Sequence, residues 1–489
     1  MNKLKDLILI IFIVFIMISL VPKKMQNDTF FTIAGGRLIL QNGVDPKEQL
    51  VWHNNLKFTN SRWGFDVLIT LIYNHFNLLG IYIFVIISVV IQGILYYCFL
   101  VKITQKKVFS FIFTVISMWE LRIAFCARAQ IISNLILLIE FYCLEQIKSR
   151  NQYIKRYIIT LIILSLIFVN VHSSTFPIYL VVFLPYFAEF ILSKMKFINK
   201  KDSSFIFEVK NFKILTIVFV IVILSGFVVP FGVKPYSDMF NVMDGSSSTF
   251  IAELQPLTIF DNMYLSSILI CTFALIAFGK QKIRISDGLF IIGFAILAMN
   301  NIRSVYYFIL ISSLCFVRLF NKFIDNYDFE IIVKSSKMKN LFEVLGSIII
   351  LMFFCKVFLI NISYDYIEYE KYPVKACYYI KNNLDIDNIK IYNGFNYGSY
   401  LEFQGIKAFI DSRSGIFTPE FNPGCNILED WYSVSNMILN YNEVFDEYEI
   451  THVLLYSYEP ISQYIKYDSK WKMIYQDSSF ILYERVEEI

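Results

Sequence analysis

The chain has 489 residues and a formal net charge of +4, with 44 Lys and Arg residues against 40 Asp and Glu residues. Hydrophobic residues make up 56% of it and charged residues only 17%, which leaves too little polar surface for a soluble globular protein and predicts that lipid surrounds much of the chain. The basic residues form short clusters between apolar runs and no single basic face, so the sequence argues against nucleic-acid binding.

Apolar runs long enough for membrane-spanning helices recur from the first residues to about residue 361. A helix needs about 20 mostly apolar residues to cross a bilayer. We expect about eleven spans, near residues 7–21, 78–101, 108–123, 130–146, 157–170, 175–193, 214–230, 263–279, 286–300, 304–317 and 341–361. The first run is not a signal peptide, because Pro22, Lys23, Lys24 and Met25 follow it without a small-residue cleavage site.

The charges between these runs predict the orientation of the chain. Lys and Arg residues concentrate in every second connection, which is the pattern of cytoplasmic loops. We therefore expect a multi-pass protein of the cytoplasmic membrane, with a transmembrane domain over residues 1–361, its N-terminus inside and residues 362–489 outside. The first outer loop, 22–77, has apolar residues at helical spacing and Trp63 near the start of its last part, which predicts an interfacial helix over about 62–76.

The C-terminal stretch 362–489 changes character and predicts a small extracytoplasmic α/β domain with a partly parallel sheet. Apolar runs shorten there to strand length at 389–392, 408–410, 452–456 and 480–483, while 374–382, 436–448 and 461–467 have helical patterns. Cys377 and Cys425 lie in this region, but their spacing alone leaves both a disulfide and two free thiols open.

Polar side chains at the outer ends of the predicted spans are the candidates for chemistry, because ionisable groups near lipid are costly to keep. Asp28 follows the first span, Arg122, Arg128 and Gln130 flank the turn between the third and fourth, and His172 and Arg303 lie in two further outer turns. The two guanidinium groups of Arg122 and Arg128 at such a boundary suit a phosphate. The alternatives are arginines that snorkel to the interface and a histidine that only packs.

The order of these residues resembles a bacterial family of polytopic GT-C-type, glycosyltransferase-like membrane proteins with a C-terminal extracytoplasmic domain. The resemblance spans nearly the whole chain, although each motif alone is weakly specific. It rests on Asp28-Thr29-Phe30-Phe31, Gly35-Gly36, Asp45, Trp52, Trp63-Gly64-Phe65-Asp66, Arg128-Ala129-Gln130, Asn170-Val171-His172, Asn301-Ile302-Arg303, Asn396-Tyr397-Gly398 and Asp411-Ser412-Arg413.

The resemblance implies a GT-C-like glycosyltransferase. Such an enzyme moves a sugar from a polyprenyl-phosphate donor to a glycan, lipid or protein acceptor on the outer face of the membrane. Asp28 would be the catalytic base, assisted by His172. Arg128, Gln130 and Arg303 would bind the lipid phosphate as its charge grows. The resemblance gives no certain cofactor; a divalent metal held by Asp28 is an open alternative, although no second acid lies beside it.

Two other classes of function compete with this one. A non-catalytic envelope scaffold or receptor would keep the fold and use its C-terminal domain, in which Asp411 and Arg413 would only form an ion pair after a strand. A lipid or glycan transporter is less favoured, because the charges lie at helix ends and not near the bilayer midplane. Convergence of the candidate residues on one cavity would favour the enzyme.

Overall fold

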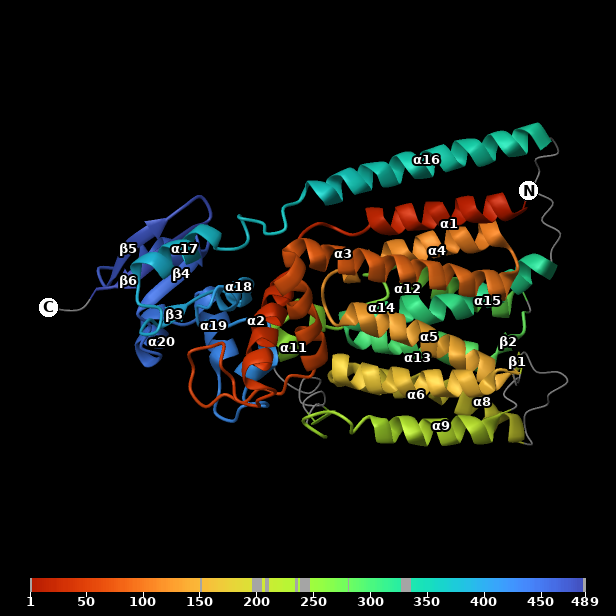
Figure 1. Cartoon of the computed structure of the whole chain (residues 1–489), viewed down its shortest axis with the longest axis horizontal. Helices are drawn as coiled ribbons and strands as arrows, with labels where there is room; N and C mark the ends of the chain where they lie inside the picture. Colours follow the sequence, from red (N-terminus) through yellow and green to blue (C-terminus); the bar gives the residue numbers. More distant parts are fainter. Residues whose placement is uncertain are drawn as a thin grey trace. The chain divides into compact units, whose positions relative to one another are not determined.

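The computed structural model describes residues 2–149, 152–195, 205–206, 211–233, 236–237, 247–279, 281–326 and 336–486 (Figure 1). The chain forms two compact units. The first, which we call the helical unit, comprises Met1–Lys23, Tyr82–Val229 and Glu253–Tyr364. The second, the mixed unit, comprises Lys24–Ile81, Pro230–Ala252 and Asp365–Ile489, and thus joins the first predicted outer loop to the C-terminal region.

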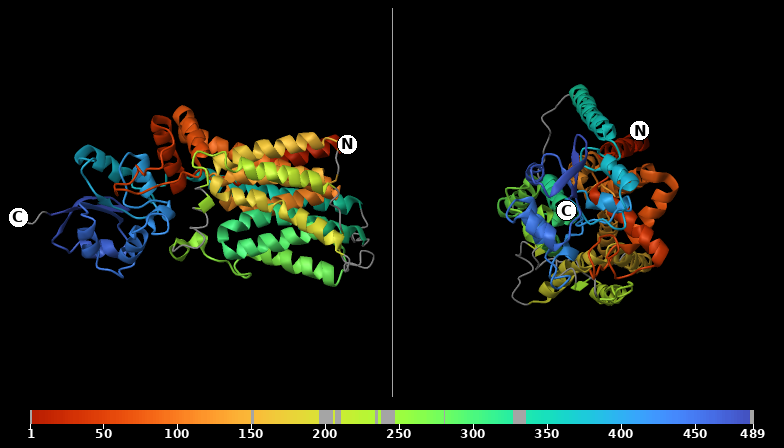
Figure 2. Two further views of the ribbon diagram at one scale, coloured as in Figure 1. Left: turned by 90° about the horizontal axis from the view of Figure 1, so that it is seen from below. Right: turned by 90° about the vertical axis from the view of Figure 1, so that its left-hand side faces the viewer.

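The helical unit is a bundle of apolar helices that lie side by side (Figures 1 and 2). Within it α5 packs on α6, α6 on α9, and α13 on α8. Its helices are α1 (Asn2–Ser19), the later part of α3 (Trp63–Thr104), α4 (Lys107–Leu121), α5 (Gln130–Lys148), α6 (Ile154–Val171), α7 (Phe176–Val181), α8 (Leu184–Lys194), α9 (Phe212–Ser225), α12 (Met263–Ala277), α13 (Ile285–Asn300), α14 (Val305–Tyr307), α15 (Ser313–Asn326) and α16 (Ser336–Ser363). A short parallel pair, β1 (Phe205–Ile206) and β2 (Ile283–Arg284), lies between helices.

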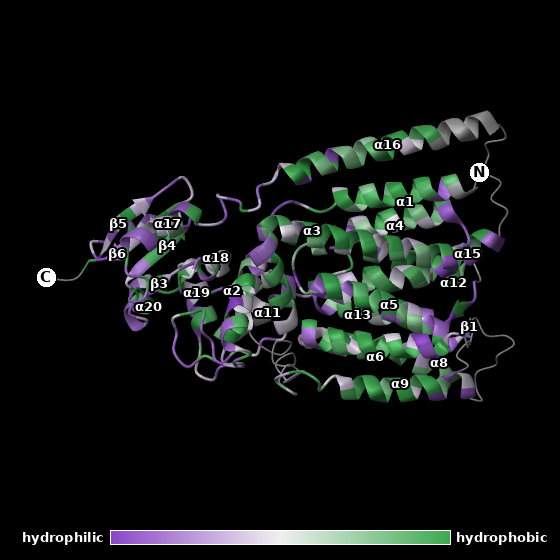
Figure 3. Cartoon of the chain, viewed as in Figure 1, coloured by the Kyte–Doolittle hydropathy of each residue, from purple (hydrophilic) through white to green (hydrophobic). Residues whose placement is uncertain are grey.

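The described part of the chain holds six helical stretches that are long and apolar enough to cross a membrane. They are Trp63–Thr104, Gln130–Lys148, Ile154–Val171, Ser173–Lys194, Ile302–Asn326 and Val344–Ser363, while α9, α12 and α13 are shorter apolar helices. Residues coloured as hydrophobic dominate the bundle in Figure 3. Each predicted span overlaps one or more helices of the structure, although the bounds differ. The chain is a multi-pass membrane protein, and the count of eleven spans stays a prediction.

Buried charges join three helices near the C-terminal end of α5. The Glu145 carboxylate accepts hydrogen bonds from Arg284 Nη2 at 2.8 Å and Arg318 Nη2 at 3.0 Å. Arg318 Nη1 also donates to Asp287 at 2.6 Å. Because a buried charge is tolerated only when it is paired, these residues fix α5, α13 and α15 to one another. Gln130 and the turn before it lie at the opposite end of α5.

The mixed unit contains a four-stranded sheet with the strand order β3-β4-β6-β5. Strands β3 and β4 are parallel, and the other two pairs are antiparallel. The strands are β3 (Ile391–Tyr392), β4 (His452–Tyr456), β5 (Trp471–Gln476) and β6 (Phe480–Arg485), and the helices are α2 (Asn27–Asn42), the first part of α3, α11 (Ser247–Phe250), α17 (Val374–Asn383), α18 (Gly398–Phe403), α19 (Ile427–Ser435), α20 (Tyr441–Glu447) and α21 (Pro460–Ile465). The predicted α/β character and partly parallel sheet are confirmed for this region.

Several predicted boundaries in the C-terminal region are wrong. Residues 408–410 form no strand of the sheet; Ala408 makes a single parallel bridge to Val51, and the apolar run is core, since Phe409 and Ile410 are fully buried. The predicted helix over 436–448 begins only at Tyr441, because the side chain of Asn440 caps α20 by accepting a hydrogen bond from the backbone of Asn442. Strand β5 was also missed, because its residues do not alternate regularly between buried and exposed positions.

Helix α2 is a further element that the sequence did not predict, because it lies inside the expected loop. Its Phe30 and Phe31 are fully buried, and α2 packs against α18. Gly36 allows α2 to approach α3, since a Cβ atom there would lie 2.1 Å from Thr70 Oγ1. Within α3, Asn77 has a non-helical φ of 52°. This kink follows the stretch predicted as the interfacial helix.

Candidate functional site

Arg128 and Arg303 of the helical unit meet at one carboxylate, that of Glu253. Arg128 Nη1 lies 3.3 Å from both carboxylate oxygens of Glu253. Arg303 approaches Oε2 of the same carboxylate with Nε at 2.9 Å and Nη2 at 2.8 Å. We call these three residues the arginine cluster. It brings together two of the arginines that the sequence proposed as phosphate ligands.

Backbone hydrogen bonds hold the segments that carry the cluster. Arg303 is in the 3₁₀ helix η4 (Ile302–Ser304), which Asn301 caps by accepting a hydrogen bond from the backbone N–H of Arg303 at 2.8 Å. Glu253 is in η3 (Ala252–Leu254), and the segment after it is tied to the end of α13, because Ile302 N donates to Gln255 O. Arg128 occupies the turn before α5. The three side chains therefore come from three separate connections between helices.

The cluster remains open to solvent. The side chains of Arg128, Glu253 and Arg303 are 29%, 45% and 51% exposed. Ion pairs of this exposure contribute roughly 0 to 1 kcal/mol to stability. Two guanidinium groups and one carboxylate also leave an excess of one positive charge. The arrangement is thus a weak structural element but a suitable receptor for an anion that exchanges with Glu253.

Gln130 and His172 are both anchored at the first turn of α5. Gln130 Oε1 accepts a hydrogen bond from Tyr307 at 3.4 Å, and its Nε2 donates to Asn134 Oδ1 at 2.8 Å. His172 Nδ1 lies 2.8 Å from Ser133 Oγ, one turn of helix after Gln130. Tyr307 follows Arg303 closely in the chain. Four of the five predicted site residues thus belong to one polar region of the helical unit.

Asp28, the fifth predicted residue, lies in the mixed unit. It occupies the first turn of α2 and is half-buried. A carboxylate there is favoured by the positive end of the helix dipole. The preceding residue, Asn27, donates its side-chain amide to Phe395 O at 3.0 Å, which fixes the start of α2. Asp28 therefore projects from a helix that is firmly built into its unit.

Arg413 forms a buried ionic centre with three carboxyl groups in the mixed unit. It pairs with Asp411, with Glu402 at 2.9 Å and with Glu48. Its guanidinium carbon also lies 4.5 Å from the ring centre of Phe31 and 4.8 Å from that of Phe58. The ion pair between Asp411 and Arg413 that the sequence proposed is present. It belongs to a larger centre that ties the segment near residue 48 to the C-terminal region.

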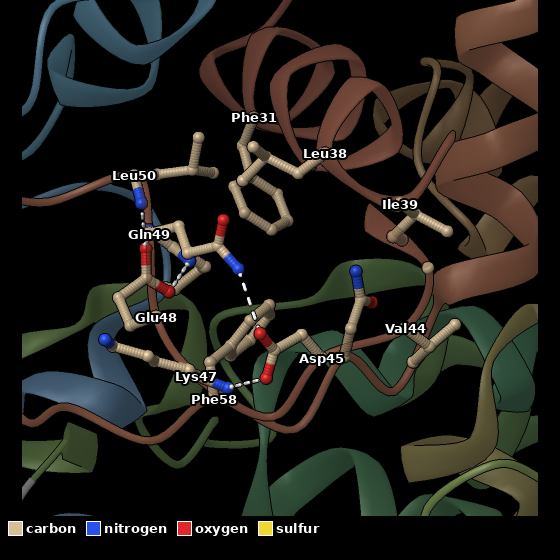
Figure 4. A pocket seen from close by; sticks show the side chains of 14 residues that line it. Phe31, Leu38, Ile39, Val44, Asp45, Lys47, Glu48, Gln49, Leu50 and Phe58 are labelled. Carbon is tan, nitrogen blue, oxygen red and sulfur yellow. Dashed lines mark hydrogen bonds and ion pairs between the residues drawn. The ribbon is translucent and has the colours of Figure 1, made fainter. Parts of the chain in front are cut away.

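A small cavity adjoins this centre (Figure 4). Phe31 and Leu38 of α2 line it together with Asp45, Lys47 and Gln49, and Asp45 accepts hydrogen bonds from the Lys47 backbone and the Gln49 side chain. Its volume is about 40 Å³, which accommodates only a few water molecules. We therefore assign the Arg413 centre a structural role.

The carboxyl groups around Arg413 differ in acidity. Burial, and next the charge of Asp411, raise the pKa of Glu402 well above its ordinary value. Burial also acts to raise the pKa of Asp411, but the adjacent Arg413 guanidinium outweighs it and lowers that pKa below its ordinary value. The raised pKa favours the neutral form of Glu402, which reduces the repulsion among the three carboxyl groups.

A divalent metal that is held by protein side chains alone takes several oxygen ligands at once. Among the residues described by the structure, no group of three His, Cys, Asp or Glu side chains is arranged to hold a metal ion. The two cysteines left open by the sequence, Cys377 and Cys425, are both free thiols.

Sequence reasoning missed Glu253, the residue that joins the two arginines. A weak signal was present, because Glu253 lies in the connection before the span at 263–279, on the side of the chain where Arg128 and Arg303 were expected. Ser133 and Tyr307 were missed as well, since a hydroxyl group inside an apolar helix carries no distinctive pattern.

No family model and no curated protein matches the chain. Two solved structures of the oligosaccharyltransferase AglB from Archaeoglobus fulgidus resemble it. One, in complex with an inhibitory peptide and a dolichol-phosphate, has 10% identity and a TM-score of 0.56 and is matched over 99% of this chain and 75% of that chain. The other, tethered by a disulfide bond to an acceptor peptide with the NVT sequon, has 11% identity and a TM-score of 0.56 over 98% and 74%. At this identity the likeness shows the fold, a polytopic membrane fold of the GT-C type.

Proposed function

We propose that the protein is a GT-C-like glycosyltransferase that moves a sugar from a polyprenyl-phosphate donor to an acceptor on the outer face of the cytoplasmic membrane. The observation that carries this proposal is the arginine cluster. Two guanidinium groups 175 residues apart in sequence, at positions 128 and 303, meet at one solvent-accessible carboxylate. A lipid phosphate is the anion that a membrane protein with this arrangement is suited to bind.

The fold supports the same proposal. The likeness to AglB extends over nearly the whole chain and includes both the helical and the mixed unit. One of the AglB structures contains a dolichol-phosphate, and the other contains an acceptor peptide. We transfer to this chain the general chemistry, a lipid-linked donor and a separate acceptor. The sugar and the acceptor, whether glycan, lipid or protein, are not specified by this likeness.

The proposed roles follow from the charge changes of the reaction. Asp28 accepts the proton of an acceptor hydroxyl while the hydroxyl oxygen attacks the anomeric carbon of the donor. The bond from that carbon to the phosphate oxygen breaks, and the oxygen keeps the electron pair. Arg128 and Arg303 stabilise the phosphate as its charge grows, with Glu253 displaced from them. His172 assists Asp28 or the phosphate, and Gln130 donates hydrogen bonds beside the arginines.

The proposal is tested by mass spectrometry of lipid-linked sugars and surface glycans from cells that carry the native protein or a variant at matched expression. Asp28→Asn should abolish one glycan decoration and cause its lipid-linked donor to accumulate. Asp387→Asn, an exposed acid of the same unit, should leave the profile unchanged.

The arginines have a matched control in the same region. Arg303→Gln should reduce the decoration at least tenfold, whereas Arg122→Gln should not, because Arg122 contacts Trp119 and not Glu253. If a complete deletion alters the profile while Asp28→Asn does not, Asp28 is not the base. If the deletion also leaves the profile unchanged, the transferase proposal fails and a non-catalytic envelope scaffold is favoured.

A further inference from the structure

A second and larger cavity lies in the mixed unit, away from every residue assigned above. Its volume is about 550 Å³, within the roughly 300 to 1,000 Å³ usual for small-molecule sites. Two loops and one helix end line it. The lining residues are His53, Asn54, Asn55, Leu56, Lys57, Phe421, Asn422, Pro423, Gly424, Cys425, Asn426, Ile427 and Tyr448.

The buried side chain of Asn422 fixes the two loops at a set distance. Its Oδ1 accepts a hydrogen bond from the backbone N–H of Lys57 at 2.9 Å, and its Nδ2 donates to the Lys57 carbonyl at 3.1 Å. The same Nδ2 also donates to Ile416 O at 2.8 Å. One amide thus satisfies both backbone groups of Lys57, as a neighbouring strand would. The two loops that form the cavity wall are therefore held together by specific hydrogen bonds.

Aromatic rings on one side of the cavity are held in place. The His53 ring packs 4.1 Å from that of Trp52, and its Nε2–H donates to Phe409 O at 2.8 Å. Burial lowers the pKa of His53 to about 4, so the ring is neutral at physiological pH. The Tyr448 ring lies 5.7 Å from His53, and its hydroxyl donates to Asp430 at 2.6 Å. These rings, together with Phe421, offer apolar faces beside polar groups.

The remaining lining side chains are polar and mostly uncharged. Asn54, Asn55 and Asn426 are exposed, and their side-chain amides make no hydrogen bond to the described part of the chain. Each amide offers both a donor and an acceptor. Lys57 is the one side chain with a full charge in the described lining. An apolar ligand would leave these amides unsatisfied, and a ligand with several phosphates would require more cations.

We propose that this cavity binds a saccharide, either neutral or with one acidic group placed at Lys57. Vicinal hydroxyl groups alternate donor and acceptor functions, which matches the amides of Asn54, Asn55 and Asn426. The less polar face of a sugar ring packs against the rings of Tyr448 and Phe421. The inference goes beyond the proposed function, because binding here requires neither a donor lipid nor catalysis.

The test uses the purified full-length protein in nanodiscs on an array of defined neutral and uronate-containing oligosaccharides. The native protein should retain at least one class of oligosaccharide. The double variant Asn54→Ala with Asn426→Ala should weaken that binding at least fivefold, and Lys57→Ala should weaken uronate-containing ligands more than neutral ones.

Matched controls lie on the same unit. Asn382→Ala and Lys407→Ala change exposed residues outside the cavity and should leave binding unchanged, and all variants should melt at the native temperature. Asp28→Asn should bind as the native protein does, which separates this inference from the transferase proposal. Absence of binding by the native protein, or an equal loss in the controls, would overturn the saccharide site.

Discussion

Arg303 contacts the carboxylate of Glu253 through two of its nitrogens, Nε at 2.9 Å and Nη2 at 2.8 Å. This contact occupies the donors that a phosphate would use. Because both side chains are about half exposed, the contact is weak and an anion with more charge can replace it. Glu253 thus competes with the ligand that we propose for Arg128 and Arg303.

Removal of this competition should strengthen phosphate binding. We expect Glu253→Gln to bind undecaprenyl phosphate several-fold more tightly than the native protein, since it leaves both guanidinium groups without their carboxylate. Arg303→Gln should bind at least tenfold more weakly, because a charge-assisted hydrogen bond contributes roughly 1.5 to 3 kcal/mol. Binding is measured with the purified protein in detergent. Glu120→Gln, which changes an acid on α4, is the control; a tighter complex in that variant too would point to an unspecific charge effect.

The close approach of α2 to α3 gives a prediction on stability. Gly36→Ala should destabilise the protein by about 2 kcal/mol or more, because the new Cβ would lie 2.1 Å from Thr70 Oγ1 and 2.3 Å from the Asp66 carbonyl oxygen. Gly35→Ala should cost less than about 1 kcal/mol, since its nearest neighbour is the Asp66 carboxylate at 3.4 Å. Thermal unfolding in detergent compares the two. Equal melting temperatures for both variants would refute the close contact.

The Arg413 centre predicts effects of unequal size on stability for two conservative changes. Asp411→Asn should destabilise the protein by about 3 to 5 kcal/mol, because it leaves the buried guanidinium short of charge. Glu402→Gln should lower the stability less, because burial raises the pKa of Glu402 and favours its neutral form, which a glutamine resembles. Thermal unfolding of the full-length protein at pH 7 measures both.

The pH dependence of the same centre has a definite sign. The pKa of Glu402 is higher in the folded protein than its ordinary value of 4.5, so its contribution to stability is fully present below about 4.5 and is lost as the pH rises through the raised pKa. Glu402→Gln should therefore become more stable relative to the native protein as the pH rises. If the difference in stability between Glu402→Gln and the native protein does not change with pH, the raised pKa of Glu402 is contradicted.

His53 predicts a loss of stability in acid. Its pKa falls from 6.5 to about 4 on folding, so its contribution is fully present above 6.5 and is lost as the pH falls from 6.5 to 4. Over this range the contribution of His53 to the free energy of unfolding falls by roughly 3 kcal/mol. The melting temperature of His53→Gln should depend less on pH in this range than that of the native protein. His75→Gln changes an exposed histidine, and its melting temperature should depend on pH as that of the native protein does. Parallel pH profiles for the native protein and His53→Gln would show that burial of His53 is not maintained in solution.

The membrane helices were predictable because each one corresponds to a single local run of apolar residues. The first turn of α5 is an example, since Arg128 and Gln130 interrupt the apolar sequence where the helix begins. Helix α2 was not predictable in the same way. Its apolar residues Phe30 and Phe31 pack against Tyr400 and other distant residues. The mean hydropathy of α2 is lower than that of a membrane span, so the sequence predicted a loop there.

The site was predictable only in part for a similar reason. Arg128 and Arg303 are visible in the sequence as charges at helix ends, but their common partner Glu253 depends on the folding of three connections. The link between Asn422 and Lys57 is likewise absent from any local pattern. These contacts join residues that are 50 to 365 positions apart, so single-sequence reasoning can name the groups without pairing them.

The most direct test of the account is transfer of a radiolabelled sugar by the purified full-length protein, with lipid-linked sugars extracted from the source cells as donors and a membrane and envelope extract as acceptor. We predict transfer by the native protein and by Asp387→Asn, and at least a hundredfold slower transfer by Asp28→Asn and by the Arg128→Gln, Arg303→Gln double variant. Equal transfer by the native protein and both impaired variants, or no transfer by the native protein, would contradict the proposed glycosyltransferase.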